Sequence, residues 1–273
     1  GHLAKKMFVS FATKVDPELA DWITNSVAFP NSMVDRITPV TTPEDIAETK
    51  VHTGLDDHWP VVSETFFQWV LEDDFPAGRP PFDKAGVQLV DDVEPYELMK
   101  LRLLNASHQG LAYFGHLMGF RLVHDAVNET LIQTLLRRYM MEEAQATLLP
   151  VPGVDLAGYQ DMLITRFTNA EVKDTIARLC AESSDRIPKW LVPVIRERLS
   201  QGLDVSLSAA IVASWARYAE GLDEEGNPID VVDNLKAEVM ASARAQRKDP
   251  LSFIRNEKLF GDLAGREEFT SPF

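Results

Sequence analysis

The hydrophobic pattern of this chain changes near residue 90. Before that point, helical spacing covers residues 3–25, with a second helix starting at Asp16 and Pro17, and short strands are predicted at 60–64 and 85–90. Beyond it, apolar residues recur with helical spacing over 95–120, 122–147, 156–183, 189–201 and 206–220. We therefore predict a mainly α chain, with a small α/β portion at residues 1–90 and an all-helical domain at residues 91–273.

The charge of the chain argues against nucleic-acid partners. Its 42 Asp and Glu residues outnumber 27 interspersed Lys and Arg residues, for a formal net charge of −15. Such a surface repels phosphate backbones, whereas it neither attracts nor repels a neutral small molecule. No uninterrupted apolar run approaches the roughly 18–20 residues that cross a bilayer. We expect a cytoplasmic protein with a small-molecule partner and no nucleic-acid or membrane partner. The oligomeric state stays open, a monomer included.

Disulfide and metal chemistry find little support in the sequence. Cys180 is the only cysteine, so no intramolecular disulfide forms and a cysteine-based zinc site is nearly excluded. His52, Asp57 and His58 have no third ligand at a familiar metal-binding spacing. We therefore predict no metal site.

The most informative segment is a predicted helix that carries Lys100, Asn105 and His108. On an α-helix with Lys100 at zero, Glu97 lies near about 60°, His108 near about 80° and Asn105 near about 140°. Leucines and small residues share this sector, so it should face a core or a cleft. Arg102 points to the opposite side, where we expect it at the surface or in a salt bridge.

These residue types suit proton transfer beside a reacting alcohol. Burial disfavours the charged form of a lysine and lowers its pKa, which a lysine general base requires. A neighbouring asparagine can donate a hydrogen bond to a developing alkoxide or carbonyl oxygen, and a histidine can bind a hydroxyl. Spacing alone leaves a structural alternative open, in which Lys100 extends past the leucines while Asn105 and His108 bond backbone groups.

Two motifs in register resemble one known family. Residues 29–39 (FPNSMVDRITP) resemble the signature of the mannitol dehydrogenase family, the polyol-specific long-chain dehydrogenases/reductases. The pattern K-x4-N-x2-H that begins at Lys100 is similar to the catalytic helix of that family. Residues 52–60 (HTGLDDHWP) and 86–92 (GVQLVDD) extend the similarity over most of residues 1–220. The resemblance implies a helical substrate domain like that of the 6-phosphogluconate dehydrogenases, preceded by the C-terminal part of a Rossmann-type domain.

The resemblance also implies an activity. It is the oxidation of a secondary alcohol of a polyol to a ketose by hydride transfer to NAD, with NADP as the alternative cofactor. D-mannitol and D-fructose are the best guess, followed by D-arabinitol or another hexitol. Lys100 would be the general base and Asn105 would polarise the reacting oxygen. Glu97 would assist proton release from the lysine, and His108 would bind a substrate hydroxyl.

Further residues carry roles by the same resemblance. Arg178 would bind a distal substrate hydroxyl. Val34 and Asp35 would contact the cofactor, with Asp35 at the junction between cofactor and substrate. Each has a structural alternative: Asp35 and Arg36 can form an ion pair that caps a turn, and Arg178 can pair with Asp174 at i,i+4 on a helix surface.

The chain departs from the family pattern in one respect. No glycine-rich dinucleotide fingerprint occurs in these residues. Family members carry one ahead of the region that matches Gly1, together with a second catalytic asparagine. We therefore expect these residues to be the C-terminal part of the family pattern and to be inactive by themselves.

Two other functions stay open. The fructuronate and tagaturonate reductases of the same family share the lysine motif but handle a carboxylate. Asn31, Ser32 and the lack of extra basic residues near His108 favour a neutral polyol instead. Alternatively, the chain is a non-catalytic, acidic helical module that acts through protein partners.

Residues 1–273 alone should bind NAD weakly or not at all. The pyrophosphate of a dinucleotide needs a glycine-rich turn at a helix N-terminus, which this sequence lacks. Isothermal titration calorimetry with NAD measures this directly. Tight NAD binding by these residues would contradict the expectation.

Overall fold

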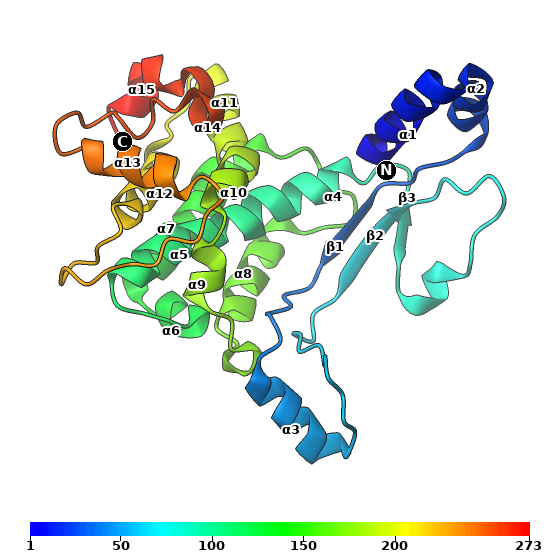
Figure 1. Cartoon of the computed structure of the whole chain (residues 1–273), viewed down its shortest axis with the longest axis horizontal. Helices are drawn as coiled ribbons and strands as arrows, with labels where there is room; N and C mark the ends of the chain where they lie inside the picture. The colour runs from blue at the N-terminus through cyan, green and yellow to red at the C-terminus, as the bar shows by residue number, and fades with distance from the viewer. The chain divides into compact units, whose positions relative to one another are not determined.

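The computed structural model describes all residues, 1–273, and they form two compact units. The first unit comprises residues 1–37 and 63–97, and the second comprises residues 38–62 and 98–273. Strands occupy only three short segments, all in the first unit, so the prediction of a mainly α chain is confirmed (Figure 1). No helix combines the length and the apolar character that a membrane span requires.

The first unit is a small α/β assembly. Its sheet has the strand order β1-β2-β3, with β1 antiparallel to β2 and β2 parallel to β3 (Figure 1). Asp16 caps the second helix by accepting from the amide of Glu18 at 3.0 Å, and Pro17 follows it, which confirms the predicted helix start. The elements are α1 (His2–Val15), α2 (Pro17–Ser26), β1 (Ser32–Asp35), β2 (Gln68–Glu72), the 3-10 helix η1 (Phe82–Ala85), β3 (Gln88–Val90) and α4 (Glu94–Met99), in which the division between the units falls.

The strand predictions were right in one place and wrong in another. The predicted strand at 85–90 contains β3, but residues 60–64 form no strand, and β1 and β2 were not predicted. Pro60 has no amide hydrogen for a ladder, and Val61 is exposed. The paired strand β2 lies further along, where Val70 and Leu71 are both buried and therefore break the alternation that marks a strand in sequence.

The second unit is helical. Its α-helices are α3 (Pro43–Thr53), α5 (Ala106–Leu117), α6 (Val123–Val127), α7 (Thr130–Arg138), α8 (Leu156–Phe167), α9 (Ile176–Cys180), α10 (Ser183–Trp190), α11 (Val192–Ser200), α12 (Ser206–Ala219), α13 (Lys236–Ala245), α14 (Glu257–Phe260) and α15 (Glu267–Thr270). It also contains the π-helices η2 (Lys100–Asn105) and η3 (Tyr139–Ala144) and the 3-10 helices η4 (Gln145–Thr147), η5 (Ala170–Val172) and η6 (Gly261–Gly265).

The predicted single helix at 156–183 is wrong, because it is interrupted between α8 and α9. Lys173 adopts a left-handed conformation there, with φ of 51°, and Asn169 accepts from the amide of Glu171 to start a short 3-10 turn. A left-handed residue reverses the local path of the chain and ends a right-handed helix. This break separates α9 from α8.

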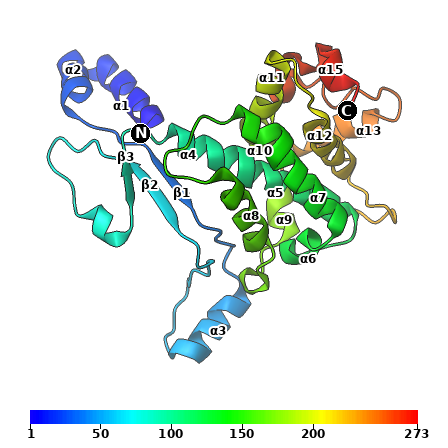
Figure 2. The same ribbon diagram turned by 180° about the vertical axis from the view of Figure 1, so that it is seen from behind.

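Helix α5 is the centre of the helical unit and packs against α7, α9 and α12 (Figures 1 and 2). Small residues allow the close approach of these helices. A Cβ on Gly115 would lie 2.9 Å from Ile176 of α9, and one on Gly110 would lie 3.1 Å from Ile211 of α12. Nine of its twelve residues are buried, so packing places most of the side chains that α5 carries.

The π-helix η3 contacts η2 and also anchors α12. Glu143 of η3 is 1% exposed and accepts from the amides of Leu207 and Ser208 at 2.7 and 2.9 Å, and from the Ser208 hydroxyl. These amides belong to the first turn of α12, where a helix has no intrahelical acceptors and favours a negative charge. Glu143 therefore joins η3 to α12.

Glu143 and its neighbour Glu142 should affect stability with opposite dependence on pH. Burial raises the pKa of Glu143, and its hydrogen bonds only partly offset this. The folded state then holds this proton more tightly than the unfolded state, so the free energy of unfolding falls as pH rises above about 4.5. The hydrogen bonds from Arg138 lower the pKa of exposed Glu142, so its contribution is present above that pH and is lost on acidification.

Thermal denaturation of Glu143→Gln and Glu142→Gln between about pH 4 and 7 checks this. The midpoint of the wild type relative to Glu143→Gln should decrease as pH rises. Relative to Glu142→Gln, it should increase. Equal slopes for the two variants would show that burial of Glu143 does not control its ionisation.

Candidate functional site

Glu97 and the residues of the K-x4-N-x2-H motif lie on one uninterrupted helical run, through α4, η2 and α5. Lys100 and Asn105 are the first and last residues of the π-helix η2, and both are half-buried. His108 lies in α5, is 6% exposed, and packs its ring against Phe167 with centroids 4.5 Å apart. Glu97 lies in α4 and is exposed. The helical run therefore leads from the exposed carboxylate of Glu97 to the buried ring of His108.

The π-helix changes the angular positions that were predicted for an α-helix. The amide of Ala106 donates to the carbonyl of Leu101, five residues back. A 3-10 helix has about 3.0 residues per turn and an α-helix about 3.6. By extension, a helix with i→i+5 hydrogen bonds has a little over four residues per turn. Lys100 and Asn105 are then separated by about 60° around the axis rather than the about 140° predicted for an α-helix. The two residues share a face, one turn apart.

Arg102 corrects another part of the sequence analysis. Its side chain is buried, so the expected surface position is wrong and the salt-bridge alternative is right. Its Nη1 lies 2.7 Å from Oε2 of Glu197 and also donates to the carbonyl of Thr147. The guanidinium thus connects η2 to the end of η4 and to α11.

Arg178 lies half-buried on α9 and forms the i,i+4 pair with Asp174 that the sequence allowed. Its Nε donates to Oδ1 of Asp174 at 2.6 Å and its Nη2 donates to Oδ2. Arg186 supports the same turn, because its Nη1 donates to the carbonyls of Arg178 and Leu179 at 2.9 and 3.1 Å. The charge of Arg178 is therefore balanced by Asp174.

Val34 and Asp35 belong to β1 of the first unit and point to opposite faces of the sheet. Val34 is 49% exposed, whereas Asp35 is 1% exposed. The side chains of Asn31 and Ser32 are engaged within this unit: Asn31 donates to Glu72 at 2.9 Å, and Ser32 accepts from the indole of Trp69 at 2.8 Å. Both side chains therefore have hydrogen-bond partners within this unit.

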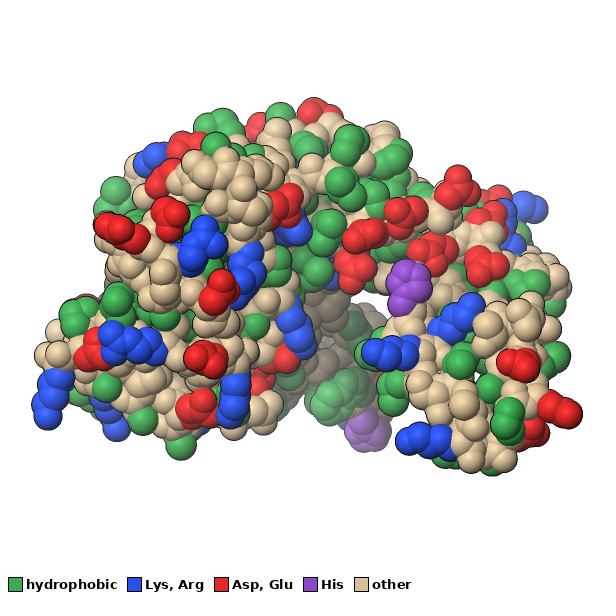
Figure 3. Space-filling view, turned by 90° about the horizontal axis from the view of Figure 1, so that it is seen from above, with side chains coloured by type: hydrophobic (Ala, Val, Ile, Leu, Met, Phe, Trp, Pro, Cys, Tyr) green, Lys and Arg blue, Asp and Glu red, His purple; other side chains and the backbone are tan.

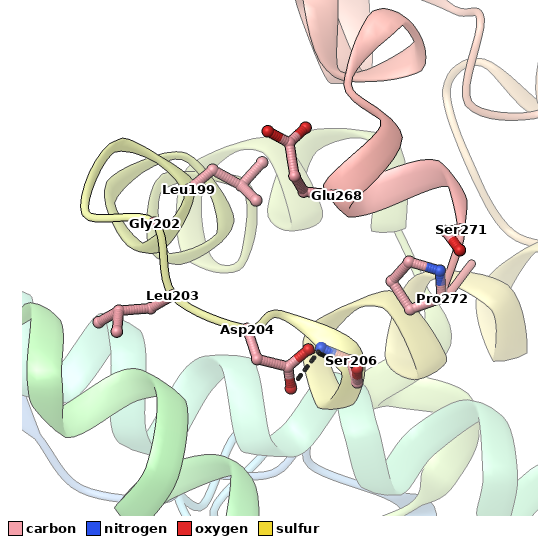
Figure 4. A pocket seen from close by; sticks show the side chains of 8 residues that line it. All are labelled: Leu199, Gly202, Leu203, Asp204, Ser206, Glu268, Ser271 and Pro272. Carbon is pink, nitrogen blue, oxygen red and sulfur yellow. Dashed lines mark hydrogen bonds between the residues drawn. The ribbon is translucent and has the colours of Figure 1, made fainter.

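The helical unit also contains a cavity whose lining does not include the predicted site residues. This cavity, of about 460 Å³, lies between the turn that joins α11 to α12 and the segment that contains α15 (Figure 4). Asp204 in its wall accepts hydrogen bonds from the amide and the hydroxyl of Ser206. The cavity is lined by Leu199, Gly202, Leu203, Asp204, Ser206, Glu268, Ser271 and Pro272.

The charges on one face of the protein agree with their interspersed order in the sequence. On the face that Figure 3 shows, acidic and basic side chains are interspersed, and no basic patch is set apart.

Sequence reasoning did not single out Tyr139, whose hydroxyl donates to the main-chain carbonyl of Arg102 at 3.0 Å. No local pattern could have connected these positions, which are 37 residues apart.

Comparison with known proteins gives consistent matches along the chain. Residues 1–84 match the family model "Mannitol dehydrogenase Rossmann domain", and residues 92–273 match "Mannitol dehydrogenase C-terminal domain". The mannitol 2-dehydrogenase of Phaeosphaeria nodorum is 43% identical over 96% of this chain and 46% of its own length. That of Aspergillus fumigatus is 43% identical over 98% of this chain and 54% of its own length. The chain thus spans about half the length of the curated relatives it matches.

Solved structures show the same fold. Pseudomonas fluorescens mannitol 2-dehydrogenase, in a ternary complex with NAD and D-mannitol, covers the whole chain with a TM-score of 0.91 at 40% identity, over 56% of its own chain. A substrate-free D-sorbitol dehydrogenase covers 99% with a TM-score of 0.88 at 34% identity, also over 56% of its own chain. These matches confirm the predicted part of a Rossmann-type domain followed by a helical domain, and the chain belongs to the mannitol dehydrogenase family.

Proposed function

We propose that this chain is the substrate-binding and catalytic part of an NAD-dependent polyol dehydrogenase that oxidises a secondary alcohol to a ketose. The observation that carries the proposal is the π-turn η2, on which Lys100 and Asn105 share one face. A base and a hydrogen-bond donor on one face can act on the same oxygen atom. D-mannitol is the proposed substrate and D-fructose the product, in keeping with the mannitol 2-dehydrogenases among its relatives.

The two parts of the chain have separate proposed tasks. Residues 1–90 would be the C-terminal part of the NAD-binding domain, and residues 91–273 the substrate-binding and catalytic domain. A bound nicotinamide would supply the acceptor for the hydride of the alcohol carbon. Within these residues, Val34 and Asp35 of β1 are the proposed contacts to it. None of the connections from strand to helix in this chain contains a glycine-rich turn, so the residues present suit the nicotinamide end rather than the pyrophosphate.

Lys100 would take the hydroxyl proton of the substrate at Nζ as the carbon–oxygen bond becomes a carbonyl. Nδ2 of Asn105 would donate a hydrogen bond to the same oxygen and stabilise the negative charge that develops there. Glu97 precedes Lys100 by about one helical turn and is exposed, so it can pass the proton from the amine to solvent. Each role uses the position of its residue along the run from α4 to α5.

His108 and Arg178 would hold other hydroxyl groups of the substrate. Asp174 balances the charge of Arg178 through two hydrogen bonds, and the guanidinium of Arg186 is directed at main-chain carbonyls. A site whose arginines are already engaged favours a neutral polyol over the carboxylate of a uronate. This arrangement therefore supports the polyol dehydrogenase rather than the uronate reductase.

Lys100→Ala in the complete enzyme should lower turnover on the order of a hundred-fold or more, because general base catalysis is lost. Polyol oxidation by the wild type should rise with pH as the amine loses its proton, and this dependence should disappear in the variant. The Michaelis constant for NAD should change little. Small primary amines added to the variant should restore part of the rate by occupying the space that the side chain leaves.

Lys189→Ala is the matched control, since Lys189 is an exposed lysine on α10 that pairs with Asp185 at 2.6 Å. It should keep normal turnover. The structural alternative predicts the reverse for Lys100→Ala, namely a lower thermal midpoint with turnover nearly intact. Measuring both quantities on the same preparation decides, and near-normal turnover would rule out the role of Lys100 as a base.

A further inference from the structure

The i→i+5 turn of η2 leaves one carbonyl for a partner outside the helix. In an α-helix, the amide of Ala106 would donate to the carbonyl of Arg102, four residues back. In η2 this amide donates to Leu101 instead, and the carbonyl of Arg102 accepts from the hydroxyl of Tyr139 at 3.0 Å. A buried carbonyl without a partner costs free energy, so the Tyr139 hydroxyl stabilises the π-turn relative to an α-turn.

Tyr139 is well suited to this task. Its side chain is fully buried at the start of η3, and η3 packs against η2. Burial raises the pKa of Tyr139, and the nearby charge of Glu143 raises it further. The hydroxyl therefore keeps its proton at any physiological pH and remains a donor.

Arg102 fixes the same turn through its side chain. Its Nη1 bonds the carbonyl of Thr147 and the carboxylate of Glu197, so the residue is held at both its main chain and its guanidinium. A second long-range contact supports η3, because Nη1 of Arg198 donates to the carbonyl of Glu142 at 2.7 Å. Two π-helices in contact are thus stabilised by bonds from outside each helix.

We propose that Tyr139 and Arg102 are positioning residues for the reaction: they hold the π-turn that places Asn105 on the same face as Lys100. The inference rests on the proposed function, because it assigns a purpose to the shared face. Neither residue needs to contact substrate. If the turn relaxed to an α-helix, Asn105 would rotate away from Lys100 by roughly a quarter turn.

The test is Tyr139→Phe in the complete enzyme, which removes one hydroxyl and keeps the ring. Turnover should fall at least about ten-fold, since small errors in placing catalytic groups are costly. The Michaelis constant for NAD should stay unchanged. The pH dependence of turnover should shift by about half a unit or more, because the surroundings of Lys100 change. If the role of Tyr139 were confined to stability, the variant would have a lower thermal midpoint. Its turnover at temperatures below that midpoint, and the pH dependence of turnover, would be unchanged.

Tyr113→Phe is the matched control. Tyr113 is also a fully buried tyrosine, and its hydroxyl donates to Oγ of Ser183 at 2.6 Å rather than to the π-turn. It should lose stability but keep turnover within about two-fold, the loss being that of an ordinary buried hydrogen bond. Normal turnover in Tyr139→Phe, or an equal loss in both variants, would overturn the proposal.

Two further variants keep the result interpretable. If Tyr139→Phe does not fold, Glu197→Gln is the alternative variant. Glu197 is partly exposed, and the substitution removes the ion pair that holds the Arg102 guanidinium. A decrease of a few-fold in turnover would support the proposal, and unchanged turnover would overturn it. Lys100→Ala, measured in parallel, distinguishes failure of the proposed function from failure of the positioning role. Normal turnover of Lys100→Ala refutes the proposed function. Loss of turnover in Lys100→Ala but not in Tyr139→Phe refutes only the positioning role.

Discussion

The hydrogen bond from the Tyr139 hydroxyl to the carbonyl of Arg102 determines how the central helical run of this protein is wound. Inside a protein, a main-chain carbonyl needs a partner, and an α-helix normally supplies it four residues later. In this chain the partner comes from η3, so the run from α4 to α5 can contain one wider turn. That turn lies at Lys100–Asn105, where the proposed chemistry takes place.

The surroundings of this turn are closely packed throughout the helical unit. Helix α5 follows η2 directly and is enclosed by α7, α9 and α12, with glycines where the neighbours approach most closely. Glu143 joins η3 to the first turn of α12, which itself packs on α5. A change in η3 would therefore reach η2 by two routes, one through Tyr139 and one through α12 and α5. Dense packing of this kind lets distant residues fix a catalytic geometry.

Much of the fold follows from local patterns in the sequence. The boundary between the first two helices was predicted from Asp16 and Pro17. The helix predicted at 206–220 from apolar spacing agrees with α12 to within one residue. What failed depends on tertiary context. The break before α9 rests on a left-handed Lys173, and β2 rests on two buried neighbours, Val70 and Leu71. Neither the break nor the strand could be predicted from the local sequence.

The candidate site divides in the same way. Residue types and the family resemblance identified Lys100, Asn105 and His108, and those roles stay predictions. Their relative orientation could not be predicted, because an i→i+5 turn differs from an α turn by less than one residue in spacing. The donor that compensates for the turn, Tyr139, is 37 residues away along the chain.

Scalar couplings across hydrogen bonds measure directly whether the helix closes i→i+5 at Lys100–Asn105. In labelled protein, the amide nitrogen of Ala106 should couple to the carbonyl carbon of Leu101 and not to that of Arg102. A coupling from Ala106 to Arg102 would show a regular α-helix. In that case Lys100 and Asn105 would not share a face, and neither the shared action on one oxygen nor the positioning role of Tyr139 would hold.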